Sequence, residues 1–166
     1  MPLYSEVLSN ESIIAELQGK YEKIAIIGCG ACTNESLAYK NSLPVFDMDE
    51  SGNKYPCATV VELERLRAFL VCTNYQVETK CFNDINGFVC MRKNKDADTY
   101  SIVWHDNPNV ILALCCTAGS GVIKELFPDI PVVCITRPIA TLFYSYSDHN
   151  GKRLICKDNS MIFPFY

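Results

Sequence analysis

The sequence predicts a single α/β domain over residues 1–166, with a three-layer, mostly parallel, Rossmann-like sheet and a C-terminal antiparallel hairpin. Three observations predict this class. Short apolar runs alternate with helical patterns, as in βαβ units. The runs at 24–27 and 110–114 are continuously apolar, which is typical of strands covered on both faces. Asn150-Gly151, between two β-rich segments, is a hairpin signal.

The helices are predicted from apolar spacing and from capping residues. Asn10 is expected to cap the first helix, in which Ile13 and Leu17 share a face. Pro56 suits the first turn of the longest helix, and Pro128 follows the end of the last one. The expected helices, in chain order, are 10–17, 34–40, 56–72, 87–92 and 119–127.

The strands are predicted from short apolar or β-branched runs. The first and fourth runs should lie side by side at the sheet centre because they are apolar throughout. Pro44 gives the second run an edge-like entry, since proline cannot donate to a ladder. The expected strands are 23–27, 43–48, 75–82, 110–114 and 130–136, with hairpin strands at 142–147 and 153–156.

Composition argues against several classes of function. The net charge is −4 and the Lys and Arg residues are scattered, which disfavours nucleic-acid binding. No stretch approaches the roughly 20 apolar residues of a membrane span, and the first residues lack the pattern of a secretory signal. We therefore expect a cytoplasmic protein that binds neither nucleic acid nor membrane. In a reduced cytosol, ten cysteines indicate metal binding or catalysis.

Paired cysteines follow the two central apolar runs: Cys29 and Cys32 follow the first, and Cys115 and Cys116 the second. Because ligands bind outside the carboxyl ends of parallel strands, these sulfurs can meet in one crevice. Side chains alternate in direction along a strand, so Cys116 is the one of the second pair expected to face it. We expect a zinc or iron–sulfur site formed by Cys29, Cys32 and Cys116, with Cys81 as candidate fourth ligand.

A thiol–disulfide enzyme is one alternative for the same residues. Cys29 would be the nucleophile and Cys32 the resolving thiol. A helix that begins at this point would favour the thiolate through its partial positive charge.

A nucleotide-binding or folate-binding module without metal is the second alternative. Gly28, Gly30 and the amides that open the next helix could hold an anionic group, and Asp47 could accept a ribose hydroxyl. Gly119, Ser120 and Gly121 would form the opposite wall. Thr33 replaces the third glycine of the dinucleotide fingerprint, so the match to that motif is incomplete.

The order of these motifs resembles a known family. The run Gly28-Cys29-Gly30-Ala31-Cys32-Thr33, then Leu114 to Val122, Pro131-Val132-Val133 and Thr141-Leu142-Phe143, is similar to the small partner subunit, or C-terminal-like domain, of methylenetetrahydrofolate reductase. The resemblance spans roughly residues 10 to 155. It implies an accessory, zinc-associated or iron–sulfur-associated module that serves one-carbon metabolism with a larger partner. Ser36 stands where that family usually has a third cysteine.

Aromatic residues concentrate near the C-terminus, in segments 142–146 and 161–166. So apolar a segment is expected to stay ordered rather than fray into water. It should pack on its own sheet as an extra strand, or cover a larger protein partner or a second copy in a homo-oligomer.

Overall fold

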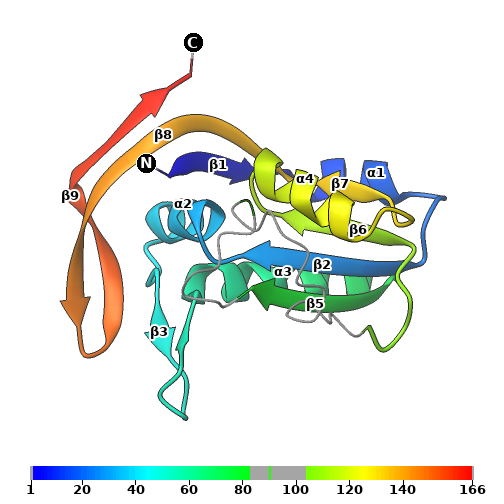
Figure 1. The fold of residues 1–166 in the computed structure, drawn as a ribbon, viewed down its shortest axis with the longest axis horizontal. Coiled ribbons are helices and arrows are strands. Elements are labelled where there is room, and N and C mark those ends of the chain that lie inside the picture. The colour runs from blue at the N-terminus through cyan, green and yellow to red at the C-terminus, as the bar shows by residue number, and fades with distance from the viewer. Residues whose placement is uncertain (1, 83–89, 91–103, 166) are drawn as a thin grey trace.

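The computed structural model describes residues 2–82, 90 and 104–165. Within these ranges the chain has a mixed α/β fold with four helices, a four-stranded parallel sheet and a three-stranded antiparallel sheet (Figure 1). A further small sheet has two strands. The predicted α/β class is confirmed at this level. No helix in the described part of the chain is long and apolar enough to cross a membrane.

The parallel sheet has the strand order β5-β2-β6-β7. Its strands are β2 (Lys23–Cys29), β5 (Gln76–Phe82), β6 (Val110–Leu114) and β7 (Val132–Cys134). The inner strands β2 and β6 pair in parallel, from Ile24 with Val110 to Gly28 with Leu114. The prediction that the two most apolar runs lie side by side at the sheet centre is therefore confirmed.

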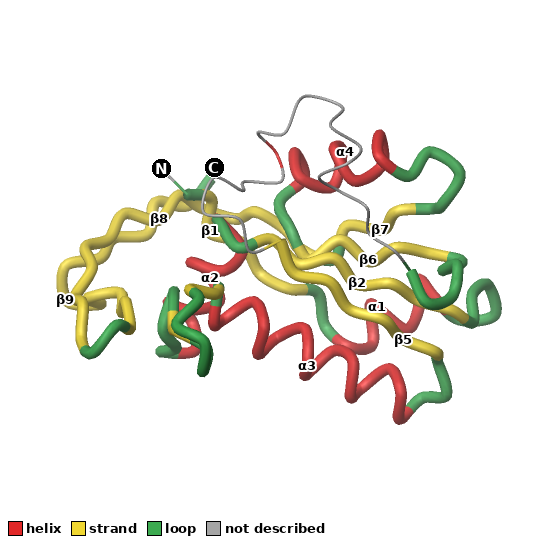
Figure 2. Tube along the Cα trace, turned by 60° about the horizontal axis from the view of Figure 1, so that its bottom comes forward, coloured by secondary structure: helices red, strands yellow, loops and turns green. Residues whose placement is uncertain are grey.

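Helices pack on both faces of the parallel sheet (Figure 2). α1 (Asn10–Leu17) and α3 (Cys57–Cys72) pack against one set of alternate residues, which includes Ile24 and Ile26 of β2. α4 (Thr117–Leu126) packs against the other set, which includes Ala25 and Ile27. Burial on both sides explains why β2 has no polar alternation. α2 (Cys32–Asn41) packs against α3 and against the antiparallel sheet.

The antiparallel sheet has the order β1-β8-β9. Its strands are β1 (Leu3–Val7), β8 (Thr136–His149) and β9 (Lys152–Pro164). The predicted hairpin is confirmed: Asn150 and Gly151 have φ values of 49° and 82°, and two-residue hairpin turns favour positive φ at both positions. Both hairpin strands are longer than predicted, and β1 was not predicted.

A single extended segment serves both sheets. β7 ends at Cys134 and β8 begins at Thr136, so only Ile135 separates them. The Ile135 N–H donates to the carbonyl of Ala113 at 3.1 Å, and the Ile135 carbonyl accepts from the Leu8 N–H at 2.9 Å. The strand expected at 130–136 therefore ends earlier than predicted, because the chain passes there into the second sheet.

The strand predicted at 43–48 is wrong. Only Asp47–Met48 (β3) is a strand, and it pairs with β4 (Lys54–Tyr55) in the two-stranded sheet. The N–H of Val45 donates to the carbonyl of Arg153 at 2.7 Å, and the N–H of Arg153 donates to the carbonyl of Phe46 at 3.0 Å. The backbone of this segment therefore forms hydrogen bonds with the tip of the β8–β9 hairpin and not with the parallel sheet.

Helix boundaries differ from the predictions mainly at the N-termini. α1 has the predicted bounds, but its cap is Ser9, whose side chain accepts from the Ser12 N–H at 3.2 Å; Asn10 is the first helical residue. α2 and α4 each begin two residues earlier than predicted, at Cys32 and Thr117. The helix expected at 87–92 lies outside the described residues, Cys90 excepted.

Candidate functional site

The four predicted metal ligands lie at the carboxyl edge, which we define as the edge of the parallel sheet where β2, β5 and β6 end. Cys29 is the last residue of β2, and Cys32 is the first residue of α2. Cys116 is the N-cap of α4, close after the end of β6. Cys81 lies in β5 opposite Gly28 of β2. Parallel topology therefore brings residues from distant parts of the sequence to one edge.

Cys32, Cys90 and Cys116 form the first group of thiols. The thiols of Cys90 and Cys116 share a hydrogen bond. Burial raises the pKa of Cys90, and Cys116 raises it further. Burial also raises the pKa of Cys32, although a backbone hydrogen bond with Leu3 opposes the rise. Cys116, Glu35 and Cys90 add to it through charge repulsion.

Cys29, Cys81, Cys115 and Cys134 form the second group. Burial, followed by repulsion from Cys29, raises the pKa of Cys81 to about 12. Burial raises the pKa of Cys115 as well, and Cys29 and Cys134 are the next causes. The thiol of Cys134 donates to the Cys115 carbonyl at 3.4 Å. Cys116 and Cys90 of the first group also raise the pKa of Cys115, so Cys115 connects the two groups along the carboxyl edge.

The thiols of the two groups lie close enough together to affect one another's ionisation. Each thiolate formed at the carboxyl edge disfavours the next, because like charges repel strongly where water is excluded. A thiophilic cation would remove that repulsion, and thiolates are the usual ligands of structural zinc and of iron–sulfur clusters. The donor type therefore fits such a group. Across residues 2–82, 90 and 104–165, no three or more His, Cys, Asp or Glu side chains are arranged to hold a metal ion.

Alkaline pH is expected to destabilise the protein through the buried thiols. Above about pH 8.5 the unfolded thiols lose protons, whereas Cys81 keeps its proton in the folded state up to about pH 12. The folded state then binds more protons than the unfolded state, so stability falls as pH rises across this window. Urea unfolding with reductant should show a shallower fall for Cys81→Ala than for the unmodified chain. Equal slopes of stability against pH in the two proteins would contradict the claim that the raised pKa of Cys81 contributes to the fall.

A buried polar framework holds the carboxyl edge in place. Asn34 of α2 is fully buried; its amide donates to the Val45 carbonyl at 2.7 Å and its oxygen accepts from the Thr59 N–H at 2.8 Å. The Thr59 hydroxyl donates to the Cys29 carbonyl at 2.9 Å. Asn34 thus ties α2 to α3 and to the 43–46 segment, and Thr59 ties α3 to the end of β2. Sequence reasoning missed Asn34 and Thr59, because no motif distinguishes them from exposed polar helix residues.

Gly28 has a packing role. A Cβ at this position would lie 2.6 Å from Cγ2 of Thr59 and 2.9 Å from Cδ1 of Leu63. The missing side chain lets α3 lie close against β2, directly below the carboxyl edge. Gly30 lies in the turn between β2 and α2.

The other residues of the nucleotide hypothesis already have partners. Gly119, Ser120 and Gly121 lie in the helix, as the predicted bounds of 119–127 require, and the Ser120 N–H donates to the Cys116 carbonyl at 2.9 Å. Asp47 is in β3, outside the parallel sheet, where its carboxylate pairs with the Lys152 ammonium at 2.9 Å. The hydrogen bond from Lys152 lowers the pKa of Asp47. The helix and the ion pair already engage these groups.

The structure adds Cys90 and Cys134 to the predicted set. Neither is among the ligands that the sequence predicts. Their contacts with Cys116 and Cys115 connect segments that are 26 and 19 residues apart, and no local spacing signals such a contact.

Comparison with known proteins gives no relative. The chain matches no protein-family model, no curated protein and no solved structure. The resemblance to the methylenetetrahydrofolate reductase family therefore stays a prediction, carried by the short motifs alone.

Proposed function

We propose that this chain is an accessory module that binds a thiophilic metal ion, zinc in the first instance, or an iron–sulfur cluster at the carboxyl edge. The observation that carries the proposal is the gathering of thiols from β2, β5, the first turn of α2 and the N-cap of α4 at that edge. The proposed ligands are Cys29, Cys32 and Cys116, with Cys81 or Cys90 as the fourth.

Two features support this assignment beyond proximity. α2 and α4 both begin at the carboxyl edge with a cysteine in or next to their first turn, where the helix end favours a thiolate. The framework of Asn34 and Thr59 fixes the Cys29 carbonyl, so the loop that carries the first pair is anchored. The ligand thiols must lose their protons on binding, so affinity should rise with pH. A bound ion or cluster would supply a structural cross-link or an electron-transfer centre.

Loss of two ligands is expected to weaken metal binding. Purified without oxygen, the chain should contain zinc, or iron with sulfide, at close to stoichiometric amounts. Cys32→Ser combined with Cys116→Ser should lower affinity at least about tenfold, since even outer-shell changes have effects of that size. Elemental and sulfide analysis, followed by titration with Zn²⁺ or Co²⁺, measures this.

The matched control is Cys72→Ser, because Cys72 is an exposed thiol at the end of α3. It should load like the unmodified chain, and circular dichroism should show all variants folded. Protein that contains no metal or sulfide and gains none on reconstitution would contradict the proposal. Equal loss in the control would show that binding is adventitious.

We extend the proposal to the role that the motif resemblance implies: a cytoplasmic module, Rossmann-like in its three layers, that serves a larger partner in one-carbon metabolism. The thiol–disulfide alternative ranks second. Reactive cysteines are partly exposed to solvent, whereas the proposed nucleophile, Cys29, is only 4% exposed. The nucleotide alternative ranks third, because Asp47 is already paired with Lys152.

A further inference from the structure

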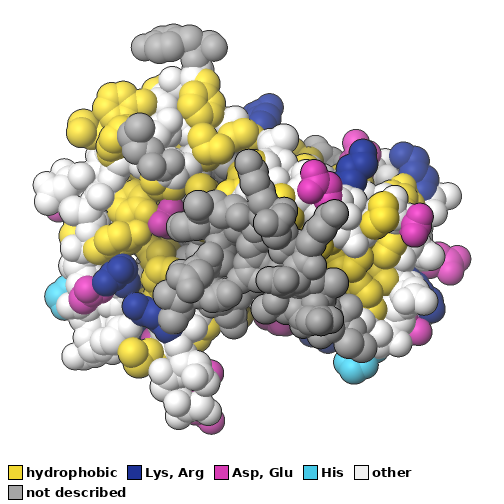
Figure 3. Space-filling model, viewed as in Figure 1, with side chains coloured by type: hydrophobic (Ala, Val, Ile, Leu, Met, Phe, Trp, Pro, Cys, Tyr) yellow, Lys and Arg dark blue, Asp and Glu magenta, His cyan; other side chains and the backbone are white. Residues whose placement is uncertain are grey.

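One face of the β8–β9 ribbon carries an apolar patch. We define the C-terminal patch as Phe143, Met161, Phe163 and Phe165, whose exposed fractions are 38, 59, 48 and 51%. Phe143 pairs with Met161 across the ladder, and the rings of Phe143 and Phe163 meet edge to face with centroids 5.1 Å apart. Hydrophobic side chains gather over the upper part of this ribbon in Figure 3. The patch is thus one continuous surface and not a set of isolated side chains.

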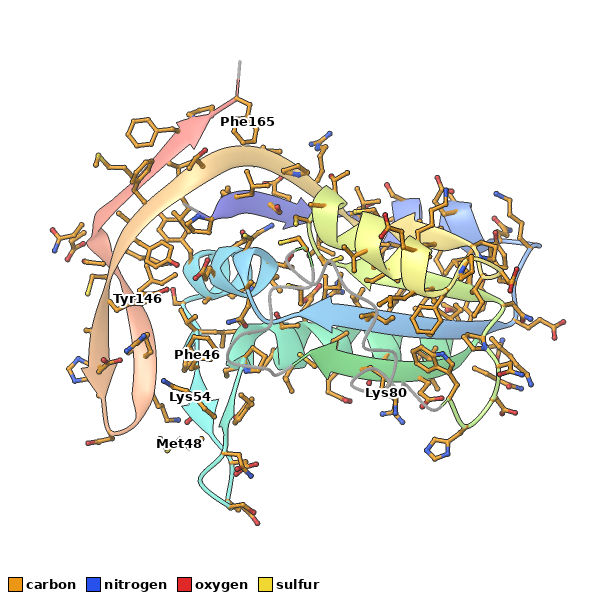
Figure 4. The ribbon with its side chains drawn as sticks, in the orientation of Figure 1. Phe46, Met48, Lys54, Lys80, Tyr146 and Phe165 are labelled. Carbon is orange, nitrogen blue, oxygen red and sulfur yellow. The ribbon has the colours of Figure 1, made fainter. Side chains whose placement is uncertain are left out.

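The opposite face of the ribbon is already covered along β8. Ala140 and Leu142 are fully buried there and pack with Tyr4 of β1. Two side-chain contacts hold the ribbon to α2 and its C-cap: the Tyr146 hydroxyl donates to Glu35 at 3.1 Å, and the Lys157 ammonium donates to the Ser42 hydroxyl at 2.8 Å. The ribbon therefore cannot turn its patch inward without losing this packing. Figure 4 shows Phe165 at the far end of β9, away from the parallel sheet.

The backbone edge of β9 is poorly suited to pairing with another strand. Ser145 pairs with Cys156 and Phe143 with Met161, so residues 157–160 bulge out of the ladder. Pro164 removes a further donor. Bulges and prolines are the features that block pairing between exposed edges. A partner must therefore be held by the side chains of the patch and not by strand addition.

Area and charge indicate what covers the patch. The exposed parts of its four side chains amount to roughly 300–500 Å², given 150–250 Å² for a large side chain. A stable interface needs about 800 Å² on each side, so the patch can form the apolar core of a small one. Residues 141–147 and 159–165 contain no Asp, Glu, Lys or Arg. A charged partner would find no opposite charge here, whereas a second copy meets an equally apolar surface without repulsion.

We propose that the C-terminal patch binds the same patch of a second copy of this chain, across a two-fold axis. An isologous contact of this kind is self-complementary, because each copy offers the surface that the other requires. The modest area makes the dimer concentration-dependent. The two carboxyl edges stay outside the contact, so dimerisation does not depend on metal loading.

Sedimentation velocity with reductant present, over a wide concentration range, tests the proposal. The unmodified chain should pass from monomer to dimer, and Phe163→Glu should weaken the dimer about tenfold or more, as expected for a central apolar contact. Val71→Glu is the matched control, since Val71 of α3 is 49% exposed and lies outside the patch. A chain that stays monomeric at every concentration overturns the proposal, and so does a dimer that Phe163→Glu leaves unchanged.

A mixing experiment separates a lost interface from a lost fold. Phe163→Glu and Phe163→Lys should each be monomeric and folded by circular dichroism. An equimolar mixture should recover dimer, because opposite charges then face each other across the axis. If the mixture stays monomeric, the patch does not meet itself and the two-fold arrangement is wrong.

Discussion

Replacing Asn34 by alanine is expected to destabilise the fold by about 3 kcal/mol. The change removes two hydrogen bonds at a fully buried site and leaves the Val45 carbonyl and the Thr59 N–H without their partner. An unsatisfied buried group has a penalty of about 1–3 kcal/mol, which is why the expected loss exceeds that of an ordinary hydrogen bond. Urea unfolding followed by circular dichroism measures the difference.

Asn41→Ala is the control for this experiment, because it makes the same change on an exposed residue of the same helix. Its effect should stay within about 0.5 kcal/mol. If Asn34→Ala lost no more stability than this control, the framework would not hold α2 to α3. A second readout is the reactivity of Cys29, which should rise in Asn34→Ala if the framework orders the end of β2.

Replacing Gly28 by alanine is expected to destabilise the fold by about 2 kcal/mol, in the range found for overpacked cores. The new Cβ would meet Cγ2 of Thr59 at 2.6 Å. Thr59 cannot rotate away freely, because its hydroxyl is bonded to the Cys29 carbonyl. Thr59→Ser removes only the methyl and keeps that hydroxyl. Gly28→Ala should therefore be milder by about 1 kcal/mol in the Thr59→Ser background.

Gly121→Ala is the control, and it is expected to change the free energy of unfolding in the opposite direction. Nothing lies within 4 Å of a Cβ at Gly121, which is exposed inside α4. Alanine is the better helix former by about 1 kcal/mol, so this change should stabilise the protein. Equal effects of Gly28→Ala in both Thr59 backgrounds would show that the close approach of α3 is not what requires a glycine.

The sequence was sufficient for the centre of the fold. β2 from Ile24 onward and β6 throughout are apolar, and only strands with packing on both faces need that pattern. Asn150-Gly151 was sufficient for the hairpin, because few residue pairs adopt two positive φ values. These features are local, so a local pattern predicts them.

The sequence was insufficient where pairing is remote. β1 pairs with β8 from Leu3 with Thr141 onward, and nothing near residue 3 indicates a partner so distant in the chain. The strand expected at 43–48 has a suitable composition, but Arg153 supplies its backbone partner. Both errors reflect competition between segments for hydrogen bonds, which composition does not encode.

For the candidate site as well, the sequence predicts some of the residues and not others. Strand ends followed by small residues predicted that Cys29, Cys32 and Cys116 lie at one edge, and β2 and β6 do pair in parallel and end beside each other there. The contact between Cys90 and Cys116 joins residues 26 positions apart, so local spacing could not predict it. Asp47 was expected in the parallel sheet only because the strand at 43–48 was expected there. That strand is wrong, and Asp47 instead pairs with Tyr55 in the two-stranded sheet.

Ile135 makes the two sheets mechanically continuous. Its backbone is bonded to Ala113 on one side and to Leu8 on the other, and the chain passes through it from β7 into β8 without a loop. A force applied along β8 would act on these two backbone hydrogen bonds in shear. Both bonds would then bear the force at the same time, and they would not break one after the other. Ala113 stands two residues before Cys115. Tension on the β8–β9 ribbon is therefore transmitted, through backbone groups and without side chains, to the carboxyl edge that carries the thiols.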